Sequence, residues 1–100
     1  MYALDQMLVQ EMIVKNDDGD NIAKASAKIE TDSVTLALEG VFFLESVAEL
    51  KLFLGDIKDL HVDRWILQLA KLDIMSHRGL RVLAKFVRLI RQRGGKVEIF

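Results

Sequence analysis

Residues 65–100 read WILQLAKLDIMSHRGLRVLAKFVRLIRQRGGKVEIF, and this stretch decides the fold. It begins with the nearly apolar run 65–69, which is typical of a strand that is covered on both faces. A helical pattern follows over residues 78–93, and Gly94-Gly95 ends it after cations in the last turn. Residues 96–100 alternate and predict one more strand. A strand, a helix and a strand in this order predict a crossover connection, and therefore a mixed sheet with helices packed on it.

The residues before this stretch add two strands and a helix. Apolar and polar residues alternate over 23–30, which predicts a strand with one face in water. A second, more buried strand is predicted over 34–38, after a turn at Asp32-Ser33. The sequence Ser46-Val47-Ala48-Glu49 has a capping-box pattern, which predicts a helix near 46–58. Its apolar face would consist of Val47, Leu50, Leu54 and Ile57. We expect the strands near 34–39 and 65–69 to be central in the sheet.

The N-terminal residues permit two interpretations. Residues 8–15 fit an extra strand, but a short helix through Leu4, Met7, Leu8 and Met12 fits the same pattern. The acidic stretch 17–21 lacks the ligand spacing of a calcium loop and is better interpreted as a turn. The 100 residues of the chain suit one domain, so we expect a single α/β domain ordered β-β-β-α-β-α-β. Residues 23–100 would form its core and residues 1–22 an N-terminal extension.

Composition narrows the class of protein. The chain is 51% hydrophobic, contains no cysteine and carries a net charge of −1. This excludes a disordered chain, a disulfide framework and a cysteine-based zinc site, and it argues against nucleic acid as a partner. The N-terminus lacks the pattern of a signal peptide, and no apolar run is long enough to span a bilayer. We therefore expect a cytoplasmic protein without direct membrane insertion.

A polar cluster, Ser76-His77-Arg78-Gly79, lies where the helix over 78–93 is expected to begin. The N-terminus of a helix presents free N–H groups and the positive end of its dipole, which favour anions. Ser76 can cap the helix, and Gly79 permits a close approach of the backbone. Ser76 and His77 are adjacent and lack an orienting carboxylate, so they are no catalytic pair. We therefore predict that the protein is not an enzyme and uses no metal or cofactor.

These features come together in a resemblance. Residues 24–100 resemble a STAS domain, the module named for sulfate transporters and anti-sigma-factor antagonists. The resemblance rests on Glu39-Gly40, on the helix with Ala48-Glu49-Leu50 and on the run WILQLAKLDIM. Its most specific signs are Gly79-Leu80 and Arg93-Gly94-Gly95, which stand at family spacing. The family motif after that strand is Asp-Ser-Ser-Gly-Leu, where this chain has Ser76-His77-Arg78-Gly79-Leu80. In the antagonist branch, a partner kinase phosphorylates the first serine of the motif, and His77 occupies that position here.

The resemblance implies a non-enzymatic regulatory module that binds a protein partner, similar to an anti-sigma-factor antagonist or a stress-signalling scaffold subunit. The partner would be a kinase-like anti-sigma factor or a scaffold subunit. An alternative is an accessory subunit of a membrane complex for lipid or anion transport. Because His77 has no hydroxyl group, we expect no phosphate there from a serine kinase, so the usual switch is absent. The neighbouring Ser76 can still accept one.

The helix over 78–93 also predicts interaction surfaces. Its polar stripe consists of Arg81, Lys85, Arg88 and Gln92, its core stripe of Leu80, Leu83, Ala84, Val87 and Ile90, and a third, apolar sector of Val82, Phe86 and Leu89. The run 41–44, VFFL, is apolar where the family is polar, and the family's usual final helix is missing from this sequence. We therefore expect a homodimer or a partner-bound state. The predicted partner-binding residues are Ser76, His77, Arg78, Gly79, Arg81, Lys85 and Phe42.

Overall fold

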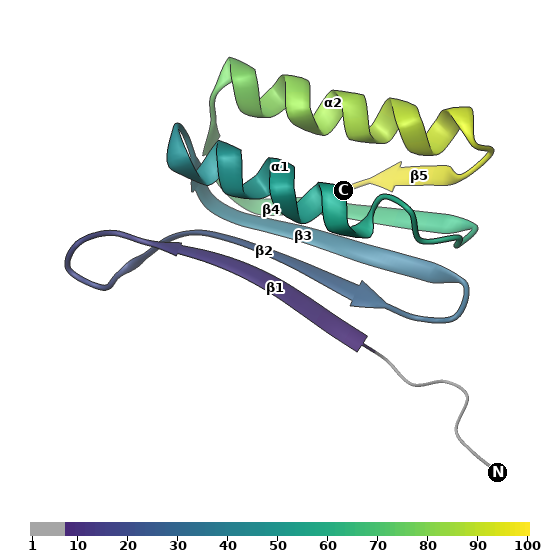
Figure 1. The fold of residues 1–100 in the computed structure, drawn as a ribbon, viewed down its shortest axis with the longest axis horizontal. Helices are drawn as coiled ribbons and strands as arrows, with labels where there is room; N and C mark the ends of the chain where they lie inside the picture. Colours follow the sequence, from purple (N-terminus) through teal and green to yellow (C-terminus); the bar gives the residue numbers. More distant parts are fainter. Residues whose placement is uncertain (1–7) are drawn as a thin grey trace, which may run out of the picture.

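A computed structural model describes residues 8–100 of the chain (Figure 1). It contains five strands and two helices in the order β-β-β-α-β-α-β. These elements are β1 (Leu8–Lys15), β2 (Asn21–Ile29), β3 (Ser33–Phe42), α1 (Glu45–Ile57), β4 (Arg64–Met75), α2 (His77–Gln92) and β5 (Lys96–Ile99). The predicted fold class is therefore confirmed.

The five strands form one mixed sheet in the order β1-β2-β3-β4-β5. β1, β2 and β3 are joined by two tight turns and run antiparallel to one another. β3, β4 and β5 run parallel, because a helix crosses over between each pair. The predicted strands near 34–39 and 65–69 belong to β3 and β4, which are interior strands, as expected.

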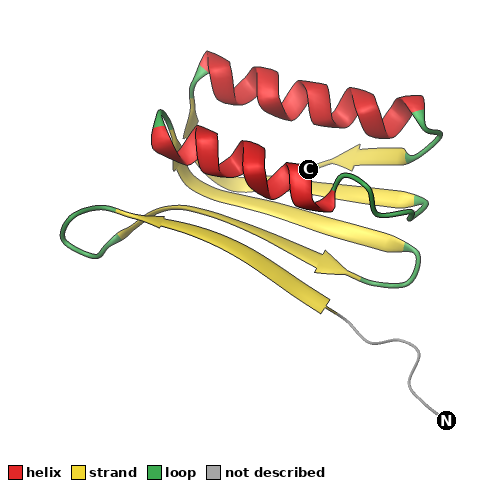
Figure 2. Cartoon of the chain, in the orientation of Figure 1, coloured by secondary structure: helices red, strands yellow, loops and turns green. Residues whose placement is uncertain are grey.

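Both helices lie side by side on one face of the sheet (Figure 2). The two crossovers lead in the same direction across the sheet, and right-handed connections of that kind place both helices on the same side. α1 packs over β1, β2 and β3, whereas α2 packs over β4 and β5. The other face of the sheet carries the polar residues of the alternating strands, including Lys24, Ser26 and Lys28.

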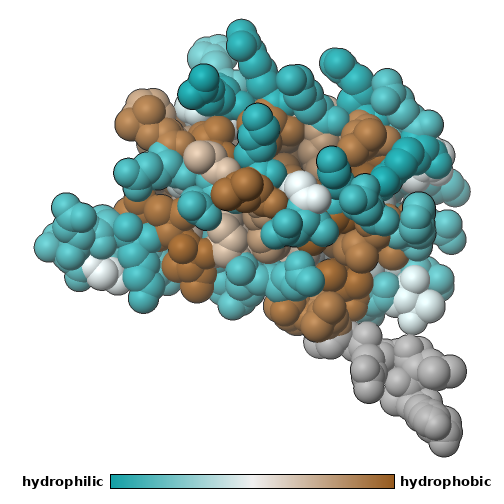
Figure 3. Space-filling view, in the orientation of Figure 1, coloured by the Kyte–Doolittle hydropathy of each residue, from teal (hydrophilic) through white to brown (hydrophobic). Residues whose placement is uncertain are grey.

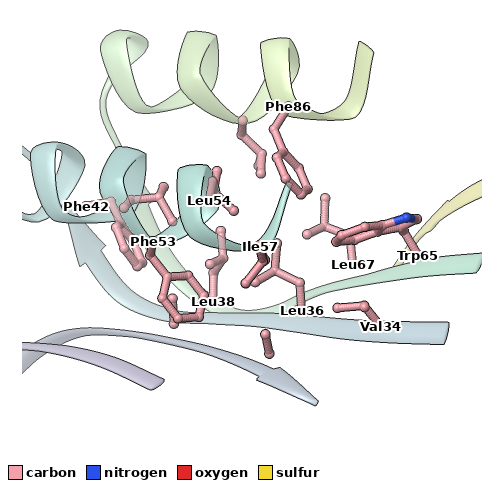
Figure 4. Close-up of a cluster of buried hydrophobic side chains, with 14 of the residues drawn as sticks. Val34, Leu36, Leu38, Phe42, Phe53, Leu54, Ile57, Trp65, Leu67 and Phe86 are labelled. Atoms are coloured by element: carbon pink, nitrogen blue, oxygen red, sulfur yellow. The ribbon is translucent and has the colours of Figure 1, made fainter. Parts of the chain in front are cut away.

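The core fills the space between the helices and the sheet (Figure 4). On the strands it is built from every second residue, because alternate side chains of a strand point to the same face. Its members are Ala23, Ala25, Ala27, Val34, Leu36, Leu38, Phe42, Trp65 and Leu67 on the strands, and Val47, Leu50, Phe53, Leu54, Ile57, Leu83, Phe86 and Ile90 on the helices. The alanines of β2 leave room for α1 to pack closely over that strand.

β4 is longer than the predicted strand 65–69, and the expected connection over residues 70–77 is mostly strand. β5 pairs only with Arg64–Leu67 of β4. Beyond the last contacts with Phe100, β4 is an edge strand that pairs with β3 alone. An edge strand tolerates polar side chains, so Lys71 and Asp73 interrupt the apolar pattern without ending the strand.

α1 does not begin with the predicted capping box. The residue that precedes its first turn is Leu44, which has a φ of 54° and provides no side-chain cap. Ser46 is instead buried within the first turn, where its Oγ accepts a hydrogen bond from the Phe43 N–H at 2.7 Å. Its hydroxyl lies 3.1 Å from the carbonyl oxygen of Val41, to which it can donate. Ser46 therefore ties the helix start to the end of β3, a role that its sequence pattern does not distinguish from capping.

Residues 8–15 form a strand that pairs with β2 along its length. Met12 and Val14 point toward the helices and pack against the core. The alternative of a helix depended partly on Leu4 and Met7, which lie outside the described residues. Among residues 8–100, no helix is both long enough and apolar enough to cross a membrane.

Candidate functional site: a cation-lined groove between the two helices

Ser76 caps α2, as its sequence position predicts. It has an extended backbone, and its Oγ accepts a hydrogen bond from the Gly79 N–H at 3.1 Å. Its own N–H donates to the carbonyl oxygen of Phe42 at 3.0 Å, so the end of β3 also holds this junction. His77 and Arg78 follow in the first turn and are exposed. The predicted partner-binding cluster therefore contains two classes of residue. The first is held within the fold, as Ser76 is, and the second faces solvent, as His77 and Arg78 do.

Gly79 belongs to the first class. It is buried, and a Cβ added there would lie 2.7 Å from Met75 Cγ and 3.3 Å from Val47 Cγ2. The glycine therefore lets the start of α2 pack against α1 and the end of β4. This explains a glycine at this position by packing within the chain, so the expectation that Gly79 contacts a partner is corrected.

Cations dominate the exposed surface of α2. The helix contains no acidic residue, and its cations are Arg78, Arg81, Lys85, Arg88 and Arg91. Within residues 8–100, the ion pairs are Lys24–Glu11 and Arg64–Glu98, so no cation of α2 is neutralised by a carboxylate of the described chain. Positive charge in the first turns of a helix opposes the helix dipole. The position of Arg78 and Arg81 therefore gives no local stabilisation to α2.

Three of these cations line a groove between α1 and α2, here called the α1–α2 groove. It has a volume of about 430 Å³ and is lined by Lys51, Leu54, Gly55, Lys58, Arg78, Arg81, Val82, Lys85, Phe86 and Leu89. The lining contains five cations and no acid. Leu54 and Phe86 are buried, Val82 and Leu89 are half-buried, and all five cations are exposed. An apolar floor thus lies between two cationic walls.

The sequence prediction included Arg78, Arg81 and Lys85 but missed the contribution of α1. Lys51 and Lys58 are seven residues apart and therefore lie on one side of that helix. The acids of α1 are segregated from them, because Glu45, Glu49 and Asp56 follow a different helical stripe. Spacing could have revealed these two stripes. It could not have shown that the cationic stripe faces α2.

A second groove lies on the other side of α2, beside β5, and is here called the α2–β5 groove. It has a volume of about 620 Å³, and its lining includes Leu80, Ala84, Val87, Arg88, Arg91 and Ile99. Leu80 and Ala84 are exposed, which corrects their placement in the core stripe. On the helix-bearing side of the molecule, hydrophobic surface appears as patches between hydrophilic side chains (Figure 3).

The two aromatic residues of the expected interface lie in the core instead. Phe42 is 0% exposed and Phe86 is 8% exposed. The prediction that Phe42 binds a partner is therefore corrected, as is the expectation that Phe86 belongs to an apolar surface sector. Phe43 and Leu44 remain from the run 41–44, and they are 56% and 70% exposed. They follow β3 in the chain, where the strand has ended and no longer buries alternate side chains.

Polar chemistry elsewhere in the molecule is sparse. Residues 8–100 contain no group of three histidines or carboxylates that could hold a metal ion. On the sheet, the guanidinium of Arg64 donates a hydrogen bond to Glu98 at 2.7 Å. This bond and the charge of the carboxylate raise the pKa of Arg64. The pair joins β4 to β5 and lies outside the lining of the α1–α2 groove.

The order of strands and helices can be compared with known proteins. The STAS domain of an antisigma-factor antagonist from Rhodobacter sphaeroides superposes with a TM-score of 0.56, and the match covers 92% of this chain and 85% of that domain at 18% identity. The chain has a STAS-like fold. At 18% identity this likeness shows the fold alone.

Two crystal structures of a protein named Mglu contain a segment that is similar to most of this fold. Each match covers 73% of this chain. One has a TM-score of 0.63 and 29% identity, and the other, of Mglu in its native form, has a TM-score of 0.62 and 23% identity. The STAS-like domain spans only 18% and 22% of those chains. No family model and no curated protein matches the sequence.

Proposed function

We propose that this STAS-like domain is a non-enzymatic regulatory module that binds a protein partner through the exposed start of α2 and the adjoining α1–α2 groove. The main support for this proposal is that five cations surround an apolar floor. None of these five cations forms an ion pair within residues 8–100. Partly accessible apolar surface next to unneutralised charge of one sign is typical of an interaction site. His77 and Arg78 extend this surface to the position of the family motif.

The proposed module works without the usual serine switch. By the resemblance to STAS domains, His77 corresponds to the family's phosphorylated serine, and it has no hydroxyl group. The nearest hydroxyl is that of Ser76, which already accepts the capping hydrogen bond from Gly79. A kinase would have to displace this bond to reach the oxygen. Partner binding would therefore be regulated by another means than phosphorylation at position 77.

Site-specific crosslinking in the native host tests this proposal. A photo-reactive amino acid is placed at His77 in one variant and at Lys28, on the uncovered face of the sheet, in a matched control. We expect a discrete protein adduct from position 77 and none from position 28. Adducts of equal yield from both positions, or none from position 77, would contradict a docking site at α2.

The identity of the crosslinked protein separates two functions. A kinase-like regulator or a signalling scaffold would support an antagonist-like role. A transporter ATPase would support the second candidate, an accessory subunit of a lipid- or anion-transport complex.

A further inference from the structure

We infer that the partner places an acidic amphipathic helix in the α1–α2 groove. This inference rests on the proposed function and goes beyond it, because it specifies the partner's secondary structure and charge. It depends on three features of the groove: its length, its apolar floor, and the sign of the charge on both of its walls.

The length and the floor suit a helix. The lining residues of α2 extend from Arg78 to Leu89, which corresponds to about 16 Å along the helix axis at 1.5 Å per residue. A partner helix of about three turns has the same length. Its apolar residues, spaced i and i+7, would meet the half-buried Val82 and Leu89, which have the same spacing on α2. Helix-in-groove binding uses this arrangement.

The charge on the walls selects acidic residues. Lys51 and Lys58 are on the α1 side, whereas Arg78, Arg81 and Lys85 are on the α2 side. A helix lying between these walls presents its two polar flanks to cations at once. Asp or Glu on both flanks would satisfy them, whereas Lys or Arg there would be repelled. Both walls therefore require the same sign of charge from a single ligand.

Other anionic ligands use the groove less completely. A free phosphate could meet two or three of the cations but would leave the apolar floor in water. A nucleic acid backbone would likewise leave it uncovered, and the net charge of −1 provides no general attraction for it. An anionic bilayer presents a broad surface, whereas the floor lies between two helices. An acidic helix is the ligand that covers the floor and neutralises both walls.

Gly55 provides a way to block the groove without disturbing the fold. It lies in α1 between Lys51 and Lys58, and a Cβ added there would meet no atom within 4 Å. Gly55→Leu therefore adds a side chain that projects into the groove and also replaces a poor helix former with a good one. Loss of binding in this variant cannot come from loss of the helix, which circular dichroism and a thermal melt would verify.

Selection from a helical peptide library tests the inference directly. The full chain is immobilised, and a displayed three-turn helix with its surface positions randomised is selected against it. We expect the enriched peptides to carry an apolar stripe flanked on both sides by Asp or Glu. As soluble peptides, they should lose about tenfold or more in affinity toward Gly55→Leu and toward Lys85→Glu. The control Lys28→Glu, with the same charge change on the uncovered sheet face, should bind them with unchanged affinity.

Several results would overturn the inference. Enrichment of neutral or basic peptides, absence of enrichment, or full affinity for Gly55→Leu would each exclude an acidic helix in this groove. So would binding of the unmodified chain to anionic vesicles or to a second copy of itself, if Gly55→Leu abolished either. The crosslinking experiment at His77 tests partner binding independently of the peptide selection. If it succeeds while the peptide selection fails, the module binds a partner by another kind of contact.

Discussion

The rings of Trp65 and Phe86 meet edge to face, with centroids 5.3 Å apart and an angle of 79° between their planes. Trp65 comes from β4 and Phe86 from α2, so this contact fixes the helix on the sheet. Phe86 also forms part of the floor of the α1–α2 groove. The same side chain thus belongs to the core on one side and to the candidate binding surface on the other.

Truncation of Phe86 should therefore destabilise the fold rather than change its association. We expect Phe86→Ala to lower the free energy of unfolding by about 3–5 kcal/mol, because it removes a buried aromatic ring and leaves a cavity. Phe42→Ala should have an effect of similar size. Urea denaturation followed by tryptophan fluorescence measures both. A stable Phe42→Ser, Phe86→Ser double variant that merely became monomeric would contradict the placement of these residues in the core.

Gly40 is expected to be intolerant of any side chain. It has a φ of +89°, and a Cβ there would overlap the carbonyl oxygen of Ile22 on the neighbouring strand. Gly40→Ala should lower the free energy of unfolding by about 2 kcal/mol or more, since it adds a steric clash to an unfavourable backbone conformation. The matched control is Gly19→Ala, which also has a positive φ but has no atom near the added Cβ. If both variants lose the same stability, the clash with Ile22 is not the cause.

Ser76→Ala should cost about 1 kcal/mol of stability, because it removes the side-chain cap of α2. Ser76→Asp should recover most of this loss, since its carboxylate can accept the same N–H hydrogen bond and lies at the positive end of the helix dipole. Thermal unfolding of the three proteins under one buffer condition measures the difference. Equal stability of Ser76→Ala and the unmodified protein would mean that the Gly79 N–H is satisfied by water.

Incubation with a serine-directed anti-sigma kinase and ATP should leave the mass of the protein unchanged. Position 77 has no hydroxyl group, and the hydroxyl of Ser76 accepts the capping bond. Intact-mass spectrometry detects a single added phosphate. A His77→Ser variant provides the matched positive test of whether the site still fits the kinase. Stable phosphate on Ser76 of the unmodified protein would show that the neighbouring hydroxyl has taken over the switch.

Most of the fold follows from local patterns in the sequence. Alternation over residues 23–30 identifies β2, and Ser76 and Gly94 mark the ends of α2, because these signals depend on hydrogen bonds made within a few residues. The C-terminal half of β4 is not predicted as strand, because Lys71 and Asp73 interrupt the apolar pattern there. These polar residues are tolerated where the short β5 no longer covers the edge of β4. Ser46 was misinterpreted because a buried serine that joins α1 to β3 has the same sequence pattern as a cap.

The rotation of α2 about its own axis could not be predicted. Apolar residues occupy two neighbouring sectors of this helix, so the sector that faces the core depends on where α1 and β4 lie. Phe86 consequently lies in the core, although it was predicted on a separate apolar sector. Leu80 and Ala84 lie on the surface, although they were predicted in the core stripe. For the same reason, the sequence could not predict that Lys51 and Lys58 line the groove, because a groove between two helices exists only when the positions of both helices are known. The cations of α2 were visible in the sequence because they belong to a single element.

The absence of acidic residues from α2 makes salt act in opposite directions on folding and on binding. Its cations stand three or four residues apart and repel one another, and Lys51 and Lys58 add to this repulsion from across the groove. Raising sodium chloride from about 0.1 M to 1 M shortens the screening length from about 10 Å to 3 Å. The added ions should stabilise the folded helix pair while they weaken its attraction for an acidic ligand. The domain would then be most stable under the conditions in which its groove is least attractive.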